Sequence, residues 1–597
     1  MPDAFELEFL DPRPAAARVP QLPLPQLPPL YYLYNFRLAL ATLQERYLGL
    51  LSAEECAFIE QFNGLPESSQ CLLARLMMRK GPLFRRMTLR YAEIPDVEGA
   101  LEALTALSWL DTDPKLSPQD LALVLNSEEL RVTLSIQRGR RTRLQRADSQ
   151  QSQLDLPLQE WPTKPRPLAE WNPHLAGAIV RLCIEPLIKR LQLLFFGNHH
   201  QSWAEFVLTD LGVKRYERVA IDADSRAFHS REEIDHFYRL NDCRIALDAG
   251  EPAEVVRERA FVPTQISSWL RSRFIHLQLR IGESLEKADK RELALQSYRE
   301  CGAIEGMVRA VRLQLRMGLR EAAERDAFAA HQCSCSEAQQ EILGRALARM
   351  NRSQRRSPKG PGIHDTAEVI ELSLPKLKDR RRIEPAVLEQ LSEPGSEVFY
   401  VENSLLTSLF GLLCWEAVFA PVQGAFFHPF QAAPADLHTA EFRARREPHF
   451  GELLGLLDTK EHEAVIWRLY RAKAGLRTNF VRWGRLRPRL LKLALQCIPA
   501  SHLKLCFERM LEDLKENVTG LPDLIQFWPT QRRYRLIEVK GPGDRLQNNQ
   551  RRWLKFFLLH EIPVAVCHVR WQDSRGTSAA TGPAPQAASS HETATAD

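Results

Sequence analysis

The chain has no long apolar segment: none of its 597 residues belongs to a run that reaches the ~18 apolar residues of a membrane-spanning helix. Its first residues, Met1 to Glu6, also lack the basic and apolar regions of a secretion signal. With 44% hydrophobic and 26% charged residues, the composition is that of a soluble globular protein, which we expect in the cytoplasm with no membrane partner. This length predicts about three or four domains.

Cysteine pairs at metal-binding spacing are missing as well. The eleven cysteines form no CxxC motif, and the one close pair, Cys333 and Cys335, has no second Cys or His pair at zinc-finger distance. We therefore expect reduced thiols buried as small apolar side chains, and no zinc module. The adjacent His199 and His200 are interpreted as part of a polar loop, because neighbouring histidines on a helix would point apart.

A strong overall charge is also absent. A net charge of +5 is small for this length, so attraction to nucleic acid must come from local clusters of cations. Any one cluster could equally be a solvated surface or a linker. The clusters that could neutralise phosphates lie at residues 138–146, 352–356, 376–382 and 471–489. Within and beyond them, the DNA-binding candidates are Arg138, Arg140, Arg141, Arg143, Arg482, Arg485, Lys515, Arg545 and Arg551.

Two predicted strands near the C-terminus carry acidic and basic side chains. In the strand that ends at Lys540, Glu538 and Lys540 are two residues apart and point to one face, while Ile537 and Val539 point to the other. The preceding strand, 521–528, is joined to it by a polar connection of hairpin length, so Asp523 can lie across from Glu538. Two carboxylates and an ammonium group then converge.

Such a cluster suits phosphodiester cleavage, in which an anionic substrate gains negative charge in the transition state. Asp523 and Glu538 would hold one or two Mg²⁺ or Mn²⁺ ions, which favour oxygen ligands, and the Val539 carbonyl could add another ligand. Lys540 would orient a bound water or neutralise the scissile phosphate. The alternative is an ordinary charge pair on a half-exposed strand, but the Pro522-Asp523 pair upstream favours the metal site.

The residues Gly520–Leu524, Ile537–Leu546, Gln550–Trp553 and Val566–Val569 together resemble the VRR-NUC branch of the PD-(D/E)-x-K nucleases, and in particular the bacterial-type Fanconi-associated nuclease family. The resemblance implies an α/β fold like that of restriction endonucleases for the C-terminal domain. It also implies two more functional residues, a glutamate on an early helix and a glutamine on the helix after the catalytic strand. These map onto Glu402 and Gln550. Animal members carry an N-terminal zinc module, which is missing here.

Glu402 also has support from its own surroundings. On a helix it would share the apolar stripe of Leu405, Leu406 and Leu409, where a buried carboxylate needs a partner such as a metal ion. Alternatively it is only an acid that favours a helix N-terminus. Glu416 is interpreted as structural or exposed. Gln550 opens a helix whose inward side we assign to Trp553, Phe556, Phe557, Leu559 and His560.

We expect a multidomain, mainly α protein. The segment Leu193 to Leu211 resembles a segment that packs inside the helical middle region of the family's proteins. The stretch from Ser268 to Met350 resembles pairs of helices of degenerate TPR units. Such units could hold DNA, bind protein or keep the neighbouring domains in place. The expected parts are a flexible segment 1–28, a helical DNA-binding region 29–165 with a SAP-like module near 118–147, a TPR-like region 166–356, the nuclease domain 357–572 and a disordered tail 573–597.

The resemblance implies a structure-selective nuclease that cuts 5′ flaps and branched DNA with 5′-to-3′ polarity in interstrand-crosslink repair. It also implies a basic pocket for a 5′-phosphate. Two alternatives remain open: a four-way junction resolvase, which requires a dimer, and a DNA-binding or solenoid scaffold with a silent nuclease fold. We expect a bacterial cytoplasmic protein that associates with the nucleoid when it acts on DNA. Residue patterns do not identify protein partners, and they do not decide between a monomer and a dimer.

Overall fold

The computed structural model describes residues 29–79, 81–133, 164–198, 201, 203, 214–221, 225–263, 266–332, 336–351, 367–375, 383–439 and 441–572. The chain forms two compact units. The first, here called the helical unit, takes residues up to 355 together with 411–481; the second, called the sheet unit, takes 356–410 together with 482–597. The residues 357–572, expected to form the nuclease domain, are divided between these two units.

The helical unit begins with the amphipathic helices that the sequence predicts. Ser52 caps the second of them, because its side chain accepts a hydrogen bond from the Glu55 backbone while the Glu55 side chain accepts one from the Ser52 backbone. The aromatic side chains of this region, such as Phe36, Phe58 and Phe62, are buried in the core. The helices are α1 (Tyr31–Arg46), α2 (Ala53–Gly64), α3 (Glu67–Met77) and α4 (Val97–Ala106).

Short strands follow that the sequence analysis did not predict, since two to four residues carry too little alternation to be recognised. A three-stranded antiparallel sheet has the order β1-β5-β2, and β3 pairs with β4. The strands are β1 (Leu83–Arg85), β2 (Leu110–Asp111), β3 (Lys115–Leu116), β4 (Arg166–Pro167) and β5 (Ile179–Leu182). Around them lie α5 (Pro118–Val124), α7 (Leu168–Trp171) and the 3-10 helices Arg86–Thr88 and Pro173–Leu175.

Several expectations fall outside the described residues. They concern the basic turn of the SAP-like module, the cation clusters 352–356 and 376–382, His199-His200, the Cys333/Cys335 pair, the N-terminal segment and the C-terminal tail. Within the described part, residues 127–133 are helical, as expected for the start of that module. The cysteines of the described residues are unpaired thiols, most of them buried, which agrees with the prediction.

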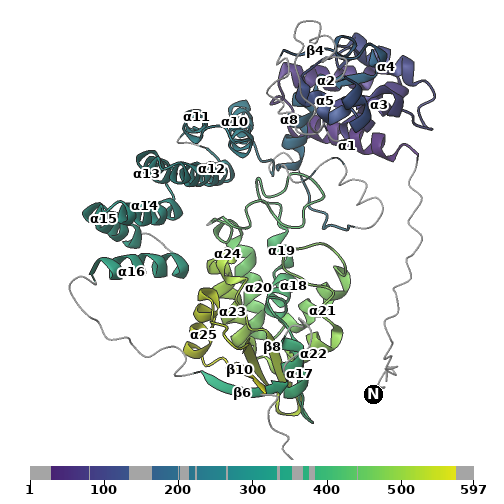
Figure 1. Cartoon of the computed structure of the whole chain (residues 1–597). Coiled ribbons are helices and arrows are strands. Elements are labelled where there is room, and N and C mark those ends of the chain that lie inside the picture. The colour runs from purple at the N-terminus through teal and green to yellow at the C-terminus, as the bar shows by residue number, and fades with distance from the viewer. Residues whose placement is uncertain are drawn as a thin grey trace, which may run out of the picture. The chain divides into compact units, whose positions relative to one another are not determined.

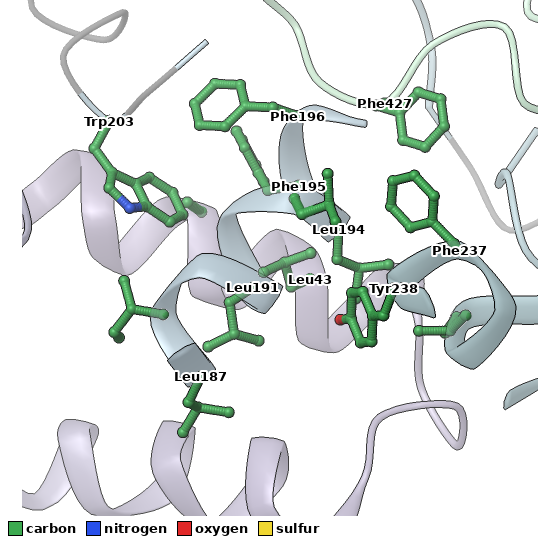
Figure 2. Close-up of a cluster of buried hydrophobic side chains, with 14 of the residues drawn as sticks. Leu43, Leu187, Leu191, Leu194, Phe195, Phe196, Trp203, Phe237, Tyr238 and Phe427 are labelled. Carbon is green, nitrogen blue, oxygen red and sulfur yellow. The ribbon is translucent and has the colours of Figure 1, made fainter. Parts of the chain in front are cut away.

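A hydrophobic cluster joins distant segments of the helical unit (Figure 2). Helix α8 (Glu185–Phe196) supplies Leu191, Leu194, Phe195 and Phe196, so the expectation that this segment packs inside is confirmed for its first half. At the end of α8, Gly197 has φ +66°, and a Cβ there would lie 2.5 Å from the Phe427 ring. Only glycine fits this approach. The other labelled members are Leu43, Leu187, Trp203, Phe237, Tyr238 and Phe427.

Paired helices then follow one another, as Figure 1 shows for α10 to α16. The small residues of this region allow close packing: a Cβ on Gly282 of one helix would lie 2.3 Å from the Tyr298 ring on the next. The predicted helical stretch from Ser268 to Met350 is therefore confirmed. The helices are α10 (Arg231–Asp248), α11 (Ala253–Arg259), α12 (Ser268–Lys287), α13 (Arg291–Glu300), α14 (Ile304–Arg316), α15 (Arg320–Gln332) and α16 (Glu337–Asn351).

The segment 411–481 completes the helical unit. Two helices follow one another in this segment, because Lys460 adopts a left-handed conformation with φ +64° and ends the first of them. Arg446 is fully buried and forms a bidentate ion pair with Asp436. The elements are α19 (Trp415–Val418), the 3-10 helix Ala444–Arg446, α20 (Glu447–Thr459) and α21 (His462–Ala472), preceded by α18 (Leu405–Leu413) at the boundary of the units.

The sheet unit is built on a five-stranded sheet of order β6-β10-β9-β8-β7. The β7/β8 and β8/β9 pairs are antiparallel, whereas β10 runs parallel to both β9 and β6. Val387 of α17 packs on the same face as Ile537 and Val539. The strands are β6 (Glu368–Pro375), β7 (Glu397–Tyr400), β8 (Leu524–Trp528), β9 (Arg533–Lys540) and β10 (Val564–Gln572).

The helices of the sheet unit begin and end at residues suited to helix ends. α22 begins at Pro488, a residue favoured in the first turn, and α23 ends before Asp513, whose side chain caps α24. Leu559, expected to face inward, is 73% exposed, so that assignment is wrong. The helices are α17 (Glu384–Leu391), α22 (Pro488–Cys497), α23 (Ala500–Glu512), α24 (Leu514–Asn517) and α25 (Asn548–Leu559), with the 3-10 helix Pro529–Gln531.

The described residues contain no single helix whose length and apolar character would let it cross a membrane. The pair α22 and α23 meets both criteria only when taken together, and the two helices are bent by 106°.

Candidate active site

The carboxylate pair predicted from the sequence lies where β8 and β9 meet. Leu524 pairs with Ile537, and the next position of this antiparallel register sets Asp523 opposite Glu538. The Val539 backbone N–H donates to Asp523 Oδ2 at 2.9 Å, and the Val401 N–H donates to the Asp523 carbonyl at 2.8 Å. Asp523 is therefore fixed between the ends of β7 and β9. The strand begins at Leu524, three residues later than expected, because residues 521–523 form the connection before it.

Lys540 is held by a carboxylate from its own strand and an amide from the next helix. Its Nζ lies 2.7 Å from Glu538 Oε1 and donates to Gln550 Oε1 at 3.0 Å. Gln550 is the third residue of α25 and forms a capping box with Gln547. Glu538 is 1% exposed and Lys540 8% exposed, so the ammonium stays near the acids.

The two acids of this pair hold protons more tightly than ordinary carboxyl groups. Burial, opposed in part by the Val539 N–H, raises the pKa of Asp523 to about 6, with the charge of Glu402 adding to the effect. Burial and the charge of Asp523 raise the pKa of Glu538 to about 8, against the opposing effect of Lys540. The three carboxylates thus face one another closely enough to repel, which is the electrostatic character of a cation site.

Glu402 does not lie on a helix, so that part of the prediction is wrong. It occupies the turn between β7 and α18, because Asn403 takes a left-handed conformation with φ +46° and the helix starts only at Leu405. Glu402 is half-buried, and the Tyr400 hydroxyl donates to its carboxylate. The Asn403 side chain accepts a hydrogen bond from the Leu521 N–H at 3.1 Å. The turn thereby connects Glu402 with the segment that carries Asp523.

The donor set suits a hard divalent cation. Within the ranges that the structure describes, no three His, Cys, Asp or Glu side chains lie close enough together to hold a metal ion. However, Glu538 Oε1 is buried, and among these residues its one polar contact is the ion pair with Lys540. Buried oxygens that repel one another fit a divalent ion, which would satisfy them. Glu416, in contrast, is exposed and pairs with Arg468, as expected.

The predicted DNA-binding cations of the sheet unit lie on its surface. Arg485 stacks over the Tyr400 ring at 5.0 Å, and its Nη1 donates to the Glu402 carbonyl at 3.5 Å. It therefore contacts the turn that carries a candidate ligand. The exposed candidates are Arg482, Arg485, Lys515, Arg545 and Arg551. The candidates of the SAP-like module, Arg138, Arg140, Arg141 and Arg143, lie outside the described residues.

Sequence reasoning missed two residues beside the acids. Tyr400 was not singled out, although its position at the end of a strand beside Glu402 was a usable signal. Glu384, the first residue of α17, adds its charge to those that raise the pKa of Asp523. Nothing in the sequence near Glu384 marks it, because a Glu before Pro at a helix start is common.

Two families of domains match the chain. The VRR-NUC domain matches residues 458–571, and the HTH domain of FAN1 matches residues 30–111, which hold α1 to α4. A crystal structure of paFAN1 bound to 2-nt 5′ flap DNA with a gap has a TM-score of 0.84 and 44% identity, covering 93% of this chain and all of that one. A second, with a 1-nt 5′ flap, has a TM-score of 0.82.

Curated relatives extend over nearly the whole chain. The Fanconi-associated nuclease 1 homolog of Pseudomonas aeruginosa is 45% identical over 551 residues, which cover 92% of this chain and 97% of the relative. The homolog of Arabidopsis thaliana is 25% identical over 90% of this chain and 67% of its own length. The protein is a nuclease, and the chain belongs to the Fanconi-associated nuclease 1 family.

Proposed function

We propose that the protein is a divalent-metal-dependent, structure-selective DNA nuclease that cuts 5′ flaps and other branched DNA with 5′-to-3′ polarity and acts in interstrand-crosslink repair. The observation that carries this proposal is the buried pair of Asp523 and Glu538, with Lys540 Nζ 2.7 Å from Glu538 Oε1. The similar paFAN1 structures, which hold 5′ flap DNA, support the substrate. We also infer that the protein acts in the cytoplasm, at the nucleoid.

The candidate ligands for one or two Mg²⁺ or Mn²⁺ ions are Glu402, Asp523, Glu538 and the Val539 carbonyl. Such an ion supplies positive charge and lowers the pKa of a bound water. Asp523 is suited to this role because the Val539 N–H orients one of its oxygens and leaves the other to bind. Glu538 presents a buried oxygen whose charge is balanced, within the described residues, by Lys540 alone.

Lys540 supplies a fixed positive charge for the phosphate. Two of its contacts, with Glu538 and Gln550, hold the ammonium group in place, so its remaining N–H can donate to a water or to a phosphate oxygen. A donor that is already positioned stabilises developing negative charge without reorganisation. Gln550 acts through Lys540: its side-chain oxygen holds the ammonium group in position, and it contributes no charge of its own.

Exposed cations would guide the DNA backbone to the acids. Arg482, Arg485, Lys515, Arg545 and Arg551 can neutralise phosphates, which adds affinity but no sequence preference. Arg485 is the best placed, because it already touches the turn of Glu402. The arginines of the SAP-like module, Arg138 to Arg143, would add contacts to the duplex backbone.

A basic cavity in the helical unit is our candidate for the 5′-phosphate. It measures about 420 Å³ and opens between α10, α12 and residues 435–439. The Arg273 guanidinium is buried there, and this burial lowers its pKa to about 10, since a buried charge lacks hydration. A phosphate would replace that hydration with charge-assisted hydrogen bonds. The basic side chains of the lining are Arg244, Arg273, His276, Arg280 and His438.

A cleavage assay tests the proposed function. Purified full-length protein is incubated with 5′-labelled flap, splayed-arm and four-way junction DNA in Mg²⁺ or Mn²⁺. We expect cutting near the flap base by the wild type and by Glu416→Gln, an exposed acid used as the matched control, and none by Asp523→Ala or Lys540→Ala. Intact flap DNA with either metal would overturn the proposal, as would an Asp523→Ala variant as fast as the wild type.

A further inference from the structure

The backbone on either side of Glu402 is tied to the segment that carries Asp523. The Val401 N–H donates to the Asp523 carbonyl at 2.8 Å, and the Asn403 side chain accepts a hydrogen bond from the Leu521 N–H at 3.1 Å. The backbone of Glu402 is therefore fixed beside Asp523. Its carboxylate is not fixed by these bonds, because rotatable side-chain bonds separate it from the backbone and Glu402 is only half-buried.

The carboxylate of Glu402 is held by the hydroxyl of Tyr400, which donates to its Oε2. Among the described residues this is the only hydrogen bond of that carboxylate, and no ion pair involves it. The second oxygen, Oε1, is left to bind another group. Asp523 shows the same arrangement, since the Val539 N–H holds its Oδ2 and leaves Oδ1. Each of these two acids thus has one oriented and one available oxygen.

The Tyr400 hydroxyl is itself well fixed. Tyr400 pairs with Leu524 at the end of β7, and its half-buried ring packs against the apolar cluster on one face of the sheet. The Arg485 guanidinium lies over the ring, 5.0 Å from its centroid, and Arg485 Nη1 donates to the Glu402 carbonyl at 3.5 Å. A hydroxyl held in this way orients a carboxylate without reorganisation of its own.

We propose that Tyr400 is a positioning residue for the metal centre: its hydroxyl orients the Glu402 carboxylate so that Oε1 can bind the divalent ion with Asp523 and Glu538. This inference rests on the proposed function, in which Glu402 is a metal ligand. Hydrogen bonds to ligating carboxylates orient them, and losing such a contact typically lowers metal affinity by about 10–100-fold. Without the hydroxyl, metal binding would carry the entropy loss of ordering the Glu402 side chain.

Mn²⁺ binding tests this role without relying on cleavage. Calorimetric titration of the metal-free, full-length protein with Mn²⁺ at pH 8 should give about 10–100-fold weaker binding for Tyr400→Phe, which keeps the ring under Arg485 and loses only the hydroxyl. The melting temperature of the metal-free variant should stay close to that of the wild type. The matched control is Tyr534→Phe, which removes a tyrosine hydroxyl 2.8 Å from His502 Nδ1 and should leave Mn²⁺ affinity unchanged.

Cleavage measurements should show the same shift in metal dependence. Tyr400→Phe should need about 10–100-fold more Mn²⁺ for half-maximal flap cutting and should approach the wild-type rate once Mn²⁺ is saturating. A variant whose rate stays low at saturating Mn²⁺, with the Mn²⁺ requirement unchanged, would contradict a role through the metal ligand.

A double-mutant cycle separates positioning from a general structural effect. Glu402→Ala should weaken Mn²⁺ binding, and adding Tyr400→Phe should weaken it no further, because Tyr400 acts only through that carboxylate. Unchanged or tighter Mn²⁺ binding by Tyr400→Phe, or the same loss again in the Glu402→Ala background, would overturn the positioning role. No Mn²⁺ binding by the wild type, or unchanged binding by Asp523→Asn or Glu402→Ala, would instead refute the metal centre of the proposed function.

Discussion

Asp523 and Glu538 hold protons more tightly than ordinary carboxyl groups, and a metal ion at the proposed site would have to displace these protons. Their raised pKa values, about 6 and about 8, mean that the folded protein binds more protons than the unfolded chain between about pH 4 and pH 8. The free energy of unfolding should therefore fall as the pH rises through this window, and the metal-free protein should be most stable at its acidic end. Metal binding should strengthen in the same direction.

This pH dependence can be measured by denaturant unfolding without metal from pH 4.5 to 8.5. Each pKa unit corresponds to about 1.4 kcal/mol, and above pH 4.5 the raised pKa values span roughly 1.5 units for Asp523 and roughly 3.5 units for Glu538, so we expect a loss on the order of 5–7 kcal/mol for the wild type. Asp523→Asn with Glu538→Gln should remove most of this slope. A wild-type stability that stays flat or rises across the window contradicts the electrostatic picture of the pair.

Lys540 should matter for cleavage but not for metal binding. Lys540→Ala removes a positioned cation, which should lower the cleavage rate by about 10²–10³-fold, the usual effect of losing one such donor. Mn²⁺ affinity should stay equal or increase, because the ammonium 2.7 Å from Glu538 no longer competes with the ion. Single-turnover cutting and Mn²⁺ titration are the measurements. Lys555→Ala, an exposed lysine on α25, is the control and should leave both unchanged.

At the scale of elements, the connection before β8 is packed tightly against α25. Gly520 has φ +80°, and a Cβ there would lie 2.8 Å from the Asn549 backbone, next to Gln550. Gly520→Ala should therefore destabilise the protein by roughly 2–4 kcal/mol and move the start of α25, which separates Gln550 from Lys540. Cleavage and the unfolding midpoint should fall together.

Gly543→Ala is a matched control for that prediction. Gly543 has a similar φ of +89°, but an added Cβ would find no atom within 4 Å. The strain of the left-handed conformation alone costs about 1 kcal/mol. If both variants lost the same free energy of unfolding, the close contact between Gly520 and α25 would contribute nothing beyond the strain of the left-handed conformation.

Residue periodicity predicted the centre of the site because a strand has a fixed alternation. Glu538 and Lys540 had to share one face, and a short hairpin brought Asp523 opposite. The position of Glu402 depended on a left-handed residue, Asn403, inside an otherwise continuous helical pattern, and periodicity carries no information about such a break. The charge of Glu384 near Asp523 could not be predicted, because its position comes from the packing of α17 on the sheet. Domain boundaries, substrate and 5′-phosphate site came from family resemblance and stay predictions.

At the scale of the whole molecule, the basic cavity of the helical unit should make cleavage sensitive to the 5′ end of the DNA. Arg244→Gln should reduce the preference for a 5′-phosphorylated flap over a 5′-hydroxyl flap by about tenfold, equivalent to ~1.4 kcal/mol of lost phosphate interaction. Competition between the two labelled flaps in one reaction measures this ratio. The control Arg299→Gln, an exposed arginine on α13, should preserve it; an unchanged ratio for Arg244→Gln would exclude this cavity as the 5′-phosphate site.

The sheet unit is assembled from two stretches of chain, 356–410 and 482–597, with the segment 411–481 between them. During synthesis the strand that precedes Glu402 leaves the ribosome first, and it must wait for Asp523, Glu538 and Lys540, which are translated near the end. A nascent or truncated polypeptide would therefore lack three of the four acidic and basic residues of the proposed site.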